Sequence, residues 1–142
     1  MDRVRVIVAD DNPPFLRKLG SLLATEFDVV ATAGDGKLAL DLVRQHKPDL
    51  VVLDIQMPEL NGIEVARKLN AFAQSTGVVI CSVETDPEIV EAALQAGALA
   101  YVVKARIETD LILAAKSVLQ RQVFLSQAIH NIPCQRSPLL LD

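Results

Sequence analysis

Polar side chains that could hold a divalent cation and a phosphoryl group each follow a short apolar stretch of the chain. These side chains are Asp10, Asp11, Asp54, Ser82 and Lys104. Three carboxylates brought close together repel one another, and a bound cation between them would offset that repulsion. Ligation by oxygen alone, with room left for water and a phosphate oxygen, is typical of Mg²⁺. The hydroxyl and the ammonium would add a neutral and a cationic donor for a phosphoryl group.

Five apolar stretches predict β-strands, and each is followed by a stretch with apolar residues at helical spacing. The expected strands are residues 4–9, 27–33, 50–53, 77–83 and 99–103. No hairpin signal separates them, so the strands should be parallel and joined by right-handed crossovers. Because the strands are almost continuously apolar, helices should cover both faces of the sheet. We therefore predict an α/β/α sandwich around a doubly wound, five-stranded parallel sheet.

In such a sheet the carboxyl ends of all the strands share one edge, where ligands of open α/β sheets bind. This placement would bring Asp54, at the end of the central strand, close to the acidic pair and to Lys104. Each residue also has a plainer interpretation, since loop carboxylates often cap helices and a polar strand end can simply be solvated. Only the joint placement of these residues favours a shared site.

Length and composition limit the remaining possibilities. The 142 residues, 51% of them hydrophobic, indicate one globular domain of about residues 1–122 followed by a tail or linker remnant at 123–142. The net charge of -4 argues against nucleic-acid binding by this segment. A charged start and the lack of a long apolar run predict a cytoplasmic protein without a membrane span. Cys81 and Cys134 form neither a disulfide framework nor a metal pattern.

The motifs at the strand ends resemble the receiver domain of bacterial two-component response regulators, in the NarL/FixJ-like branch. The resemblance covers about residues 3–122. Its motifs are Asp10-Asp11, Asp54-Ile55-Gln56-Met57-Pro58, Asn61-Gly62, Ser82, Ala96-Gly97-Ala98 and Tyr101-Val102-Val103-Lys104. The resemblance implies a flavodoxin-like sheet with strand order 2-1-3-4-5. It also implies a phosphorylation-dependent signalling switch that is not a turnover enzyme.

The resemblance further implies a phosphoacceptor and a metal site. Asp54 would accept a phosphoryl group from a sensor histidine kinase or a histidine phosphotransfer protein. Mg²⁺ would be bound by Asp11, Asp54 and the backbone carbonyl of Gln56, and Asp10 would act through a metal-bound water.

Three further residues would respond to the phosphoryl group if the resemblance holds. Lys104 would pair with the phosphoryl oxygens and Ser82 would hydrogen-bond to them, while Tyr101 would move inward together with Ser82. Two residues depart from the family pattern. Ala105 follows Lys104 where many receivers have a proline, and Val83 follows Ser82 where a small residue is usual.

Two other functions remain open from the sequence. One is a pseudo-receiver that only docks partners, although such a protein would not need Asp54, Ser82 and Lys104. The other is a phosphohydrolase with an aspartyl-phosphate intermediate, but enzymes of the haloacid dehalogenase type have an aspartate where this chain has Gln56. The sequence also leaves open whether the full protein regulates transcription through a following DNA-binding domain or is a stand-alone receiver.

The first and last expected helices carry more apolar residues than packing on one sheet face requires. These residues are Phe15, Leu16, Leu19, Leu22 and Leu23 in the first helix and Leu111, Ile112, Leu113, Ala114, Ala115, Val118 and Leu119 in the last. The surplus predicts a homodimer formed through one of these helices. The alternative is that the apolar tail from Phe124 to Ile129 folds back over this surface within one molecule.

Overall fold

The computed structural model of the protein describes residues 3–127. The strands are β1 (Arg5–Ala9), β2 (Asp28–Ala33), β3 (Leu50–Leu53), β4 (Gly77–Ser82), β5 (Ala100–Val103) and β6 (Phe124–Leu125). The helices are α1 (Pro13–Ala24), α2 (Gly36–His46), α3 (Gly62–Phe72), α4 (Pro87–Gln95) and α5 (Ile107–Leu119), with a short 3-10 turn η1 (Lys104–Arg106) before α5. None of the described helices has the length and apolar character needed to cross a membrane.

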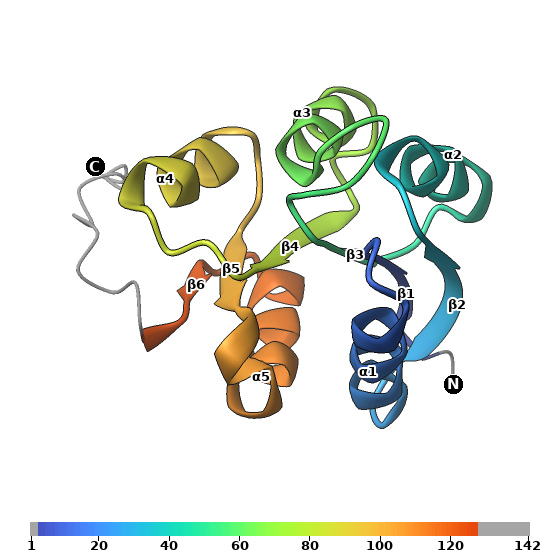
Figure 1. The fold of residues 1–142 in the computed structure, drawn as a ribbon. Coiled ribbons are helices and arrows are strands. Elements are labelled where there is room, and N and C mark those ends of the chain that lie inside the picture. The colour runs from blue at the N-terminus through green and yellow to red at the C-terminus, as the bar shows by residue number, and fades with distance from the viewer. Residues whose placement is uncertain (1–2, 128–142) are drawn as a thin grey trace.

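The described strands form a single parallel sheet in the order β2-β1-β3-β4-β5-β6. Figure 1 shows α2, α3 and α4 on one face of this sheet and α1 and α5 on the other. The predicted α/β/α sandwich and the order 2-1-3-4-5 are therefore confirmed. A short sixth strand at the β5 edge, which we did not predict, adds to the five expected strands.

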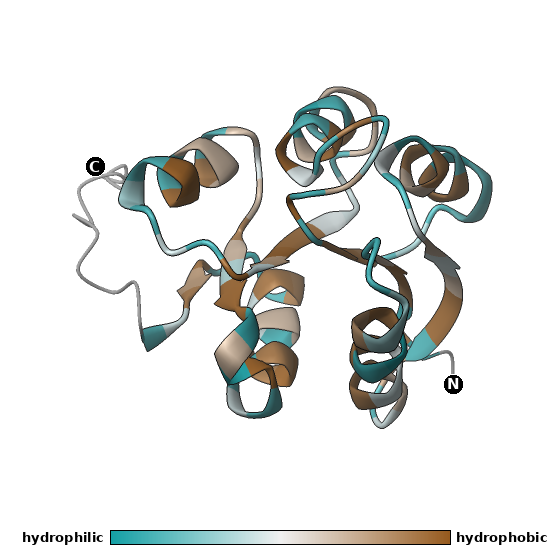
Figure 2. Cartoon of the chain, viewed as in Figure 1, coloured by the Kyte–Doolittle hydropathy of each residue, from teal (hydrophilic) through white to brown (hydrophobic). Residues whose placement is uncertain are grey.

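Each face of the sheet buries its own apolar layer. Successive side chains of β3 point to opposite faces, so Val51 and Leu53 pack with α2, α3 and α4, whereas Leu50 and Val52 pack with α1 and α5. Figure 2 shows hydrophobic residues along the central strands and hydrophilic residues on the outward sides of the helices. Packing in these two layers fixes the strands relative to one another, so that their carboxyl ends form one edge of the sheet.

A loop between β3 and α3 folds closely over the end of the central strand. Asn61 begins α3 with a capping box, in which its side chain and that of Glu64 each accept a backbone N–H from the other residue. The backbone N–H of Gly62 donates to the carbonyl of Ile55 at 2.8 Å. A Cβ atom at Gly62 would collide with the carbonyl oxygen of Asp54, so only glycine permits this approach.

The chain beyond α5 returns to the sheet. The backbone N–H of Phe124 donates to the carbonyl of Leu99 at 2.9 Å, which starts the parallel pairing of β6 with β5. Phe124 packs on the α1 and α5 side of the sheet and Leu125 on the opposite side. This part of the tail lies along β5. Ala128 and Ile129, which the alternative to the homodimer would fold back with it, lie outside the described residues.

We expect Gly62→Ala to lower the free energy of unfolding by about 1–3 kcal/mol, because a methyl group must displace backbone at the end of β3. Urea denaturation monitored by circular dichroism would measure this loss. Gly20→Ala is the matched control, since a Cβ at this position in α1 meets no atom within 4 Å. The control should gain about 0.5–1 kcal/mol from helix propensity. Equal stability of Gly62→Ala and the parent would contradict the close approach.

Candidate functional site

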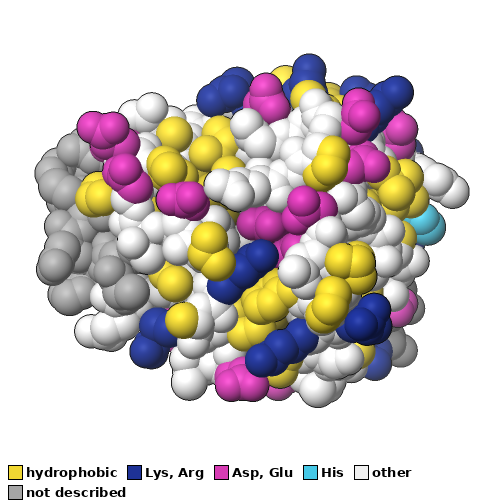
Figure 3. All heavy atoms as spheres, in the orientation of Figure 1, with side chains coloured by type: hydrophobic (Ala, Val, Ile, Leu, Met, Phe, Trp, Pro, Cys, Tyr) yellow, Lys and Arg dark blue, Asp and Glu magenta, His cyan; other side chains and the backbone are white. Residues whose placement is uncertain are grey.

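Three carboxylates meet at the carboxyl edge of the sheet. The last residues of β1 and β3, Ala9 and Leu53, are paired, so the next residues, Asp10 and Asp54, lie beside each other. Carboxylate oxygens of Asp10, Asp11 and Asp54 all lie within 4.8 Å of one another. Asp10 and Asp54 are buried, whereas Asp11 is exposed. Figure 3 shows acidic side chains gathered near the middle of this face, with a basic side chain beside them.

Lys104 brings a positive charge into this group from the end of β5. Its Nζ lies 2.9 Å from Oδ2 of Asp10 and 3.3 Å from Oδ2 of Asp54. The same Nζ lies 4.3 Å from the centroid of the Phe15 ring, within the range of a cation–π interaction. Burial alone would lower the pKa of Lys104, but its contact with Asp10 and the charge of Asp54 outweigh burial and raise it. The ammonium therefore stays charged between the two carboxylates.

Burial also changes the protonation of Asp54. Burial first, and the nearby charge of Asp10 second, raise the pKa of Asp54 above its ordinary value. The ammonium of Lys104 and the backbone N–H of Ile55, which donates to Oδ1 at 2.7 Å, act in the opposite direction. A further cation at this edge would favour the ionised carboxylate, which is the nucleophilic form.

The acidic group has the chemistry of a hard-cation site. Oδ2 of Asp10 is buried and accepts no hydrogen bond of suitable geometry within residues 3–127, although Lys104 Nζ lies close to it. The single ammonium leaves a net negative charge among the three carboxylates, and a divalent cation would offset it. Carboxylate oxygens from Asp10, Asp11 and Asp54 are the ligand type that Mg²⁺ prefers. The donor set therefore fits Mg²⁺.

Ser82 and Tyr101 are linked through the backbone of Glu84. Ser82, buried at the end of β4, accepts the Glu84 N–H on its Oγ at 3.1 Å. The hydroxyl of Tyr101 donates to the carbonyl of Glu84 at 2.9 Å. Tyr101 is fully buried, and burial raises the pKa of its hydroxyl to about 12. Its side chain thus already occupies an inward position next to the Ser82 segment.

The rim of the site contains two residues whose place could not be read from the sequence. Glu84 accepts a hydrogen bond from Nε2 of Gln56 at 3.3 Å, so its side chain lies beside the loop that follows Asp54. Phe15, which we assigned only to the apolar face of α1, also lines a hollow of about 540 Å³ together with Lys104 and Val83. Val83 is 66% exposed. No motif marks Glu84 or Phe15, since only the folded loops bring them here.

Cys81 has the structural role expected from the sequence. Its side chain lies in the apolar layer between the sheet and α1 and α5, and burial raises the pKa of its thiol to about 12. A thiol with so high a pKa is a poor nucleophile or metal ligand at neutral pH. Cys134 lies outside the described residues.

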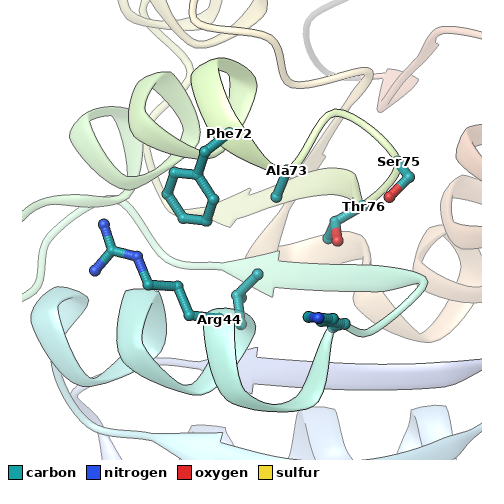
Figure 4. Close-up of a pocket in the computed structure, with 7 residues that line it drawn as sticks. Arg44, Phe72, Ala73, Ser75 and Thr76 are labelled. Carbon is teal, nitrogen blue, oxygen red and sulfur yellow. The ribbon is translucent and has the colours of Figure 1, made fainter.

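A second pocket, of about 480 Å³, lies between α2 and α3 and contains none of the predicted site residues. Figure 4 shows the side chain of Arg44 extending toward the ring of Phe72, and the guanidinium carbon lies 4.6 Å from the ring centroid. Thr76, which also lines the pocket, precedes β4 and so marks the amino edge of the sheet. The pocket is therefore remote from the carboxylates at the other edge.

Comparisons with known proteins agree with this geometry. Residues 6–116 match the family model described as "Response regulator receiver domain". The chain is 37% identical over 117 residues to the "Probable transcriptional regulatory protein NarL" of Mycobacterium tuberculosis, covering 80% of this chain and 53% of NarL. It is 32% identical over 134 residues to the "Transcriptional regulatory protein DegU" of Brevibacillus brevis, covering 92% of this chain and 57% of DegU. The chain thus spans little more than half the length of these relatives.

A solved structure gives the same result. The signal receiver domain of the NarL response regulator from Mycobacterium tuberculosis superposes with a TM-score of 0.80 at 34% sequence identity. The superposition covers 84% of this chain and 98% of that domain. With the acidic edge, the parallel sheet and the family match in agreement, this chain belongs to the response regulator receiver domain family.

Proposed function

We propose that this protein is a phosphorylation-dependent signalling switch of a two-component system, with Asp54 as the phosphoacceptor. A sensor histidine kinase or a histidine phosphotransfer protein would be the donor. The observation that carries the proposal is the buried Asp54 carboxylate beside Asp10 and 3.3 Å from the Lys104 ammonium. Phosphoryl transfer depends mainly on positioning and on neutralising charge, and this arrangement supplies both.

In the transfer step, an oxygen of the Asp54 carboxylate attacks phosphorus as the bond from phosphorus to the donor histidine nitrogen breaks. The products are an acyl phosphate on Asp54 and a free imidazole. Asp11, Asp54 and the backbone carbonyl of Gln56 would hold Mg²⁺, with Asp10 acting through a water molecule. The ion, when bound, supplies charge neutralisation at the phosphoryl oxygens. Lys104 is close enough to Asp54 to pair with the same oxygens.

Ser82 and Tyr101 would carry the response to phosphorylation. The Ser82 oxygen accepts the Glu84 N–H, which leaves its hydroxyl hydrogen available for a phosphoryl oxygen. A shift of Ser82 toward Asp54 would move the Glu84 backbone, and the Tyr101 hydroxyl is bonded to that backbone. The surface formed by α4, β5 and α5 would then change with the phosphorylation state.

The proposal also covers the extent of the domain, the location of the protein and the output of the full-length chain. We propose that residues 1–122 form the receiver domain of a cytoplasmic protein and that this segment binds no nucleic acid. Residues 123–142 would be a tail or linker, whose first residues pair with β5 as β6. The phosphoryl group stays on the protein's own Asp54 until water removes it, so the chain would act as a switch and not as a turnover enzyme. The names of NarL and DegU describe transcriptional regulators. A full protein with a DNA-binding domain would by analogy regulate transcription.

The two alternative functions have less support from the site. A pseudo-receiver would have no use for a partly buried lysine held between two buried carboxylates, because burying these charges costs free energy. A phosphohydrolase of the haloacid dehalogenase type would need a carboxylate at residue 56, but the Gln56 side chain is an amide bonded to Glu84.

Replacing the phosphoacceptor tests the central claim. Incubation with acetyl phosphate and Mg²⁺ should add one phosphoryl group to the parent and none to Asp54→Asn, because the amide keeps the shape but removes the nucleophile. Intact-protein mass spectrometry reads the added mass. Asp28→Asn, at an exposed aspartate that starts β2, is the control and should be labelled like the parent. Equal labelling of Asp54→Asn would refute the assignment.

Removal of the exposed carboxylate tests the metal site. Asp11→Ala should weaken Mg²⁺ binding by at least about tenfold, because a metal ligand is lost while the buried core is untouched. Isothermal titration calorimetry measures the dissociation constant without relying on phosphorylation. Asp28→Ala, which removes one negative charge away from the site, controls for the change in net charge. The metal assignment fails if Asp11→Ala and Asp28→Ala bind Mg²⁺ equally well.

We also propose that the protein forms a homodimer through α1 or α5. Leu113 of α5 is 56% exposed, whereas Ile112 is half-buried and packs against the apolar layer below it. Leu113→Glu is therefore the better test, because a charge at Ile112 would also disturb the fold. Leu38→Glu, on the opposite face at 43% exposure, is the matched control.

Sedimentation equilibrium with and without phosphorylation should show a dimer for the parent and for Leu38→Glu. If α5 forms the interface, Leu113→Glu should be monomeric, because burying an unpaired carboxylate there opposes association. A parent that remains monomeric in both conditions would reject the dimer.

A further inference from the structure

Ser126 lies beyond the expected end of the receiver domain, yet its side chain is completely buried. Its hydroxyl donates to Oδ2 of Asp110 at 2.7 Å, and its Oγ accepts the backbone N–H of Val103 at 3.0 Å. Its own backbone N–H donates to the carbonyl of Tyr101 at 3.0 Å. One residue just after β6 therefore makes three hydrogen bonds to β5 and α5.

The ionised state of Asp110 determines which groups donate in the hydrogen bonds of Ser126. It is 5% exposed, and it also accepts hydrogen bonds from Nε of Arg106 at 3.0 Å and from Oγ1 of Thr109 at 3.1 Å. Burial alone would raise the pKa of Asp110, but the hydrogen bonds from Ser126, Arg106 and Thr109 outweigh burial and lower it. An ionised carboxylate only accepts, so the Ser126 hydroxyl must donate to it and offer a lone pair to the Val103 N–H.

The hydrogen-bond network ends directly beside Lys104. Val103 is the last residue of β5, and its buried N–H would lose this acceptor without the Ser126 hydroxyl. Lys104 begins the turn η1, whose last residue, Arg106, is tied to Asp110 in α5. Val103, through Ser126, and Arg106, through its side chain, are thus tied to the same carboxylate on either side of Lys104. From this anchored backbone the side chain reaches Asp10 and Asp54.

We propose that Ser126 and Asp110 are positioning residues that fix the end of β5 so that Lys104 reaches the phosphoryl group on Asp54. The inference rests on the role of Lys104 in the proposed function. It assigns a part in phosphorylation to Ser126, which lies beyond position 122 in the part of the chain that the sequence marks only as a tail.

A double-mutant cycle in the full chain tests whether Ser126 acts through Lys104. Ser126→Ala should slow labelling of Asp54 by acetyl phosphate and Mg²⁺ by about three- to tenfold, the range expected for one lost hydrogen bond. In a Lys104→Ala background the same change should have no further effect. Ser126→Thr keeps the hydroxyl and should recover most of the parent rate.

Thr76→Val separates positioning from general loss of stability. Thr76 is also buried, and its hydroxyl donates to the carbonyl of Pro48 at 2.8 Å, at the opposite edge of the sheet. Its loss should lower the free energy of unfolding much as Ser126→Ala does, while the labelling rate stays at the parent value. Urea denaturation of each variant establishes that all are folded under the assay conditions.

Two results would overturn the inference. One is equal slowing by Ser126→Ala with and without Lys104, which indicates a structural role only. The other is an unchanged rate in Ser126→Ala while Lys104→Ala is slow, which rejects the inference and leaves the proposed function intact.

Failure of the proposed function would show itself separately, as an unlabelled parent. The inference is then judged by the nuclear Overhauser effect between the Lys104 ε-methylene protons and the Phe15 ring in the unphosphorylated protein. Ser126→Ala should weaken this effect, and Thr76→Val should not. An effect of the same strength in Ser126→Ala and the parent rejects the positioning role.

Discussion

The arrangement of side chains at the carboxyl edge of the sheet depends on one positive charge that lies between two buried carboxylates. Asp10 and Asp54 stand on neighbouring strands with little access to water, so their charges would repel strongly if nothing compensated for them. The Lys104 ammonium contacts both. Loss of one member of such a buried group leaves an unpaired charge, which costs more than the intact group contributes. The strands β1, β3 and β5 are therefore linked electrostatically at their ends as well as through the sheet.

This charge balance explains how a small chemical change could alter the protein. A phosphoryl group on Asp54 would add negative charge where an ammonium already lies, so the lysine could redistribute its contacts with little movement of the backbone. Two routes lead outward from this point. One passes from Ser82 through the Glu84 backbone to the Tyr101 hydroxyl, and the other follows the end of β5 to α5. Both are chains of hydrogen bonds between buried or partly buried groups, which have few alternative arrangements.

The sequence predicts the fold and the acidic edge because both depend on local patterns. Continuous apolar strands ending in a polar residue identify Asp54 and Lys104 without any knowledge of distant contacts. The strand β6 has only two residues, which is too few for a periodic signal in the sequence. It is held in place by a hydrogen bond between Ser126 and Asp110, which are 16 residues apart. Such pairings arise only in the folded chain. For the same reason the sequence does not identify Glu84, whose contacts with Gln56, Ser82 and Tyr101 depend on the path of the loop after β4.

The short strand β6 also affects what other molecules can do with this sheet. An open edge strand offers unpaired backbone groups to any extended chain, and such edges promote aggregation. Here β5 has its hydrogen-bonding groups occupied by the protein's own chain, and the strand that covers it has only two residues. A strand from another molecule would therefore have too few residues to pair with on this side of the sheet. The surface around α4, β5 and α5 is thus exposed without leaving the backbone of β5 open to fibril-like growth.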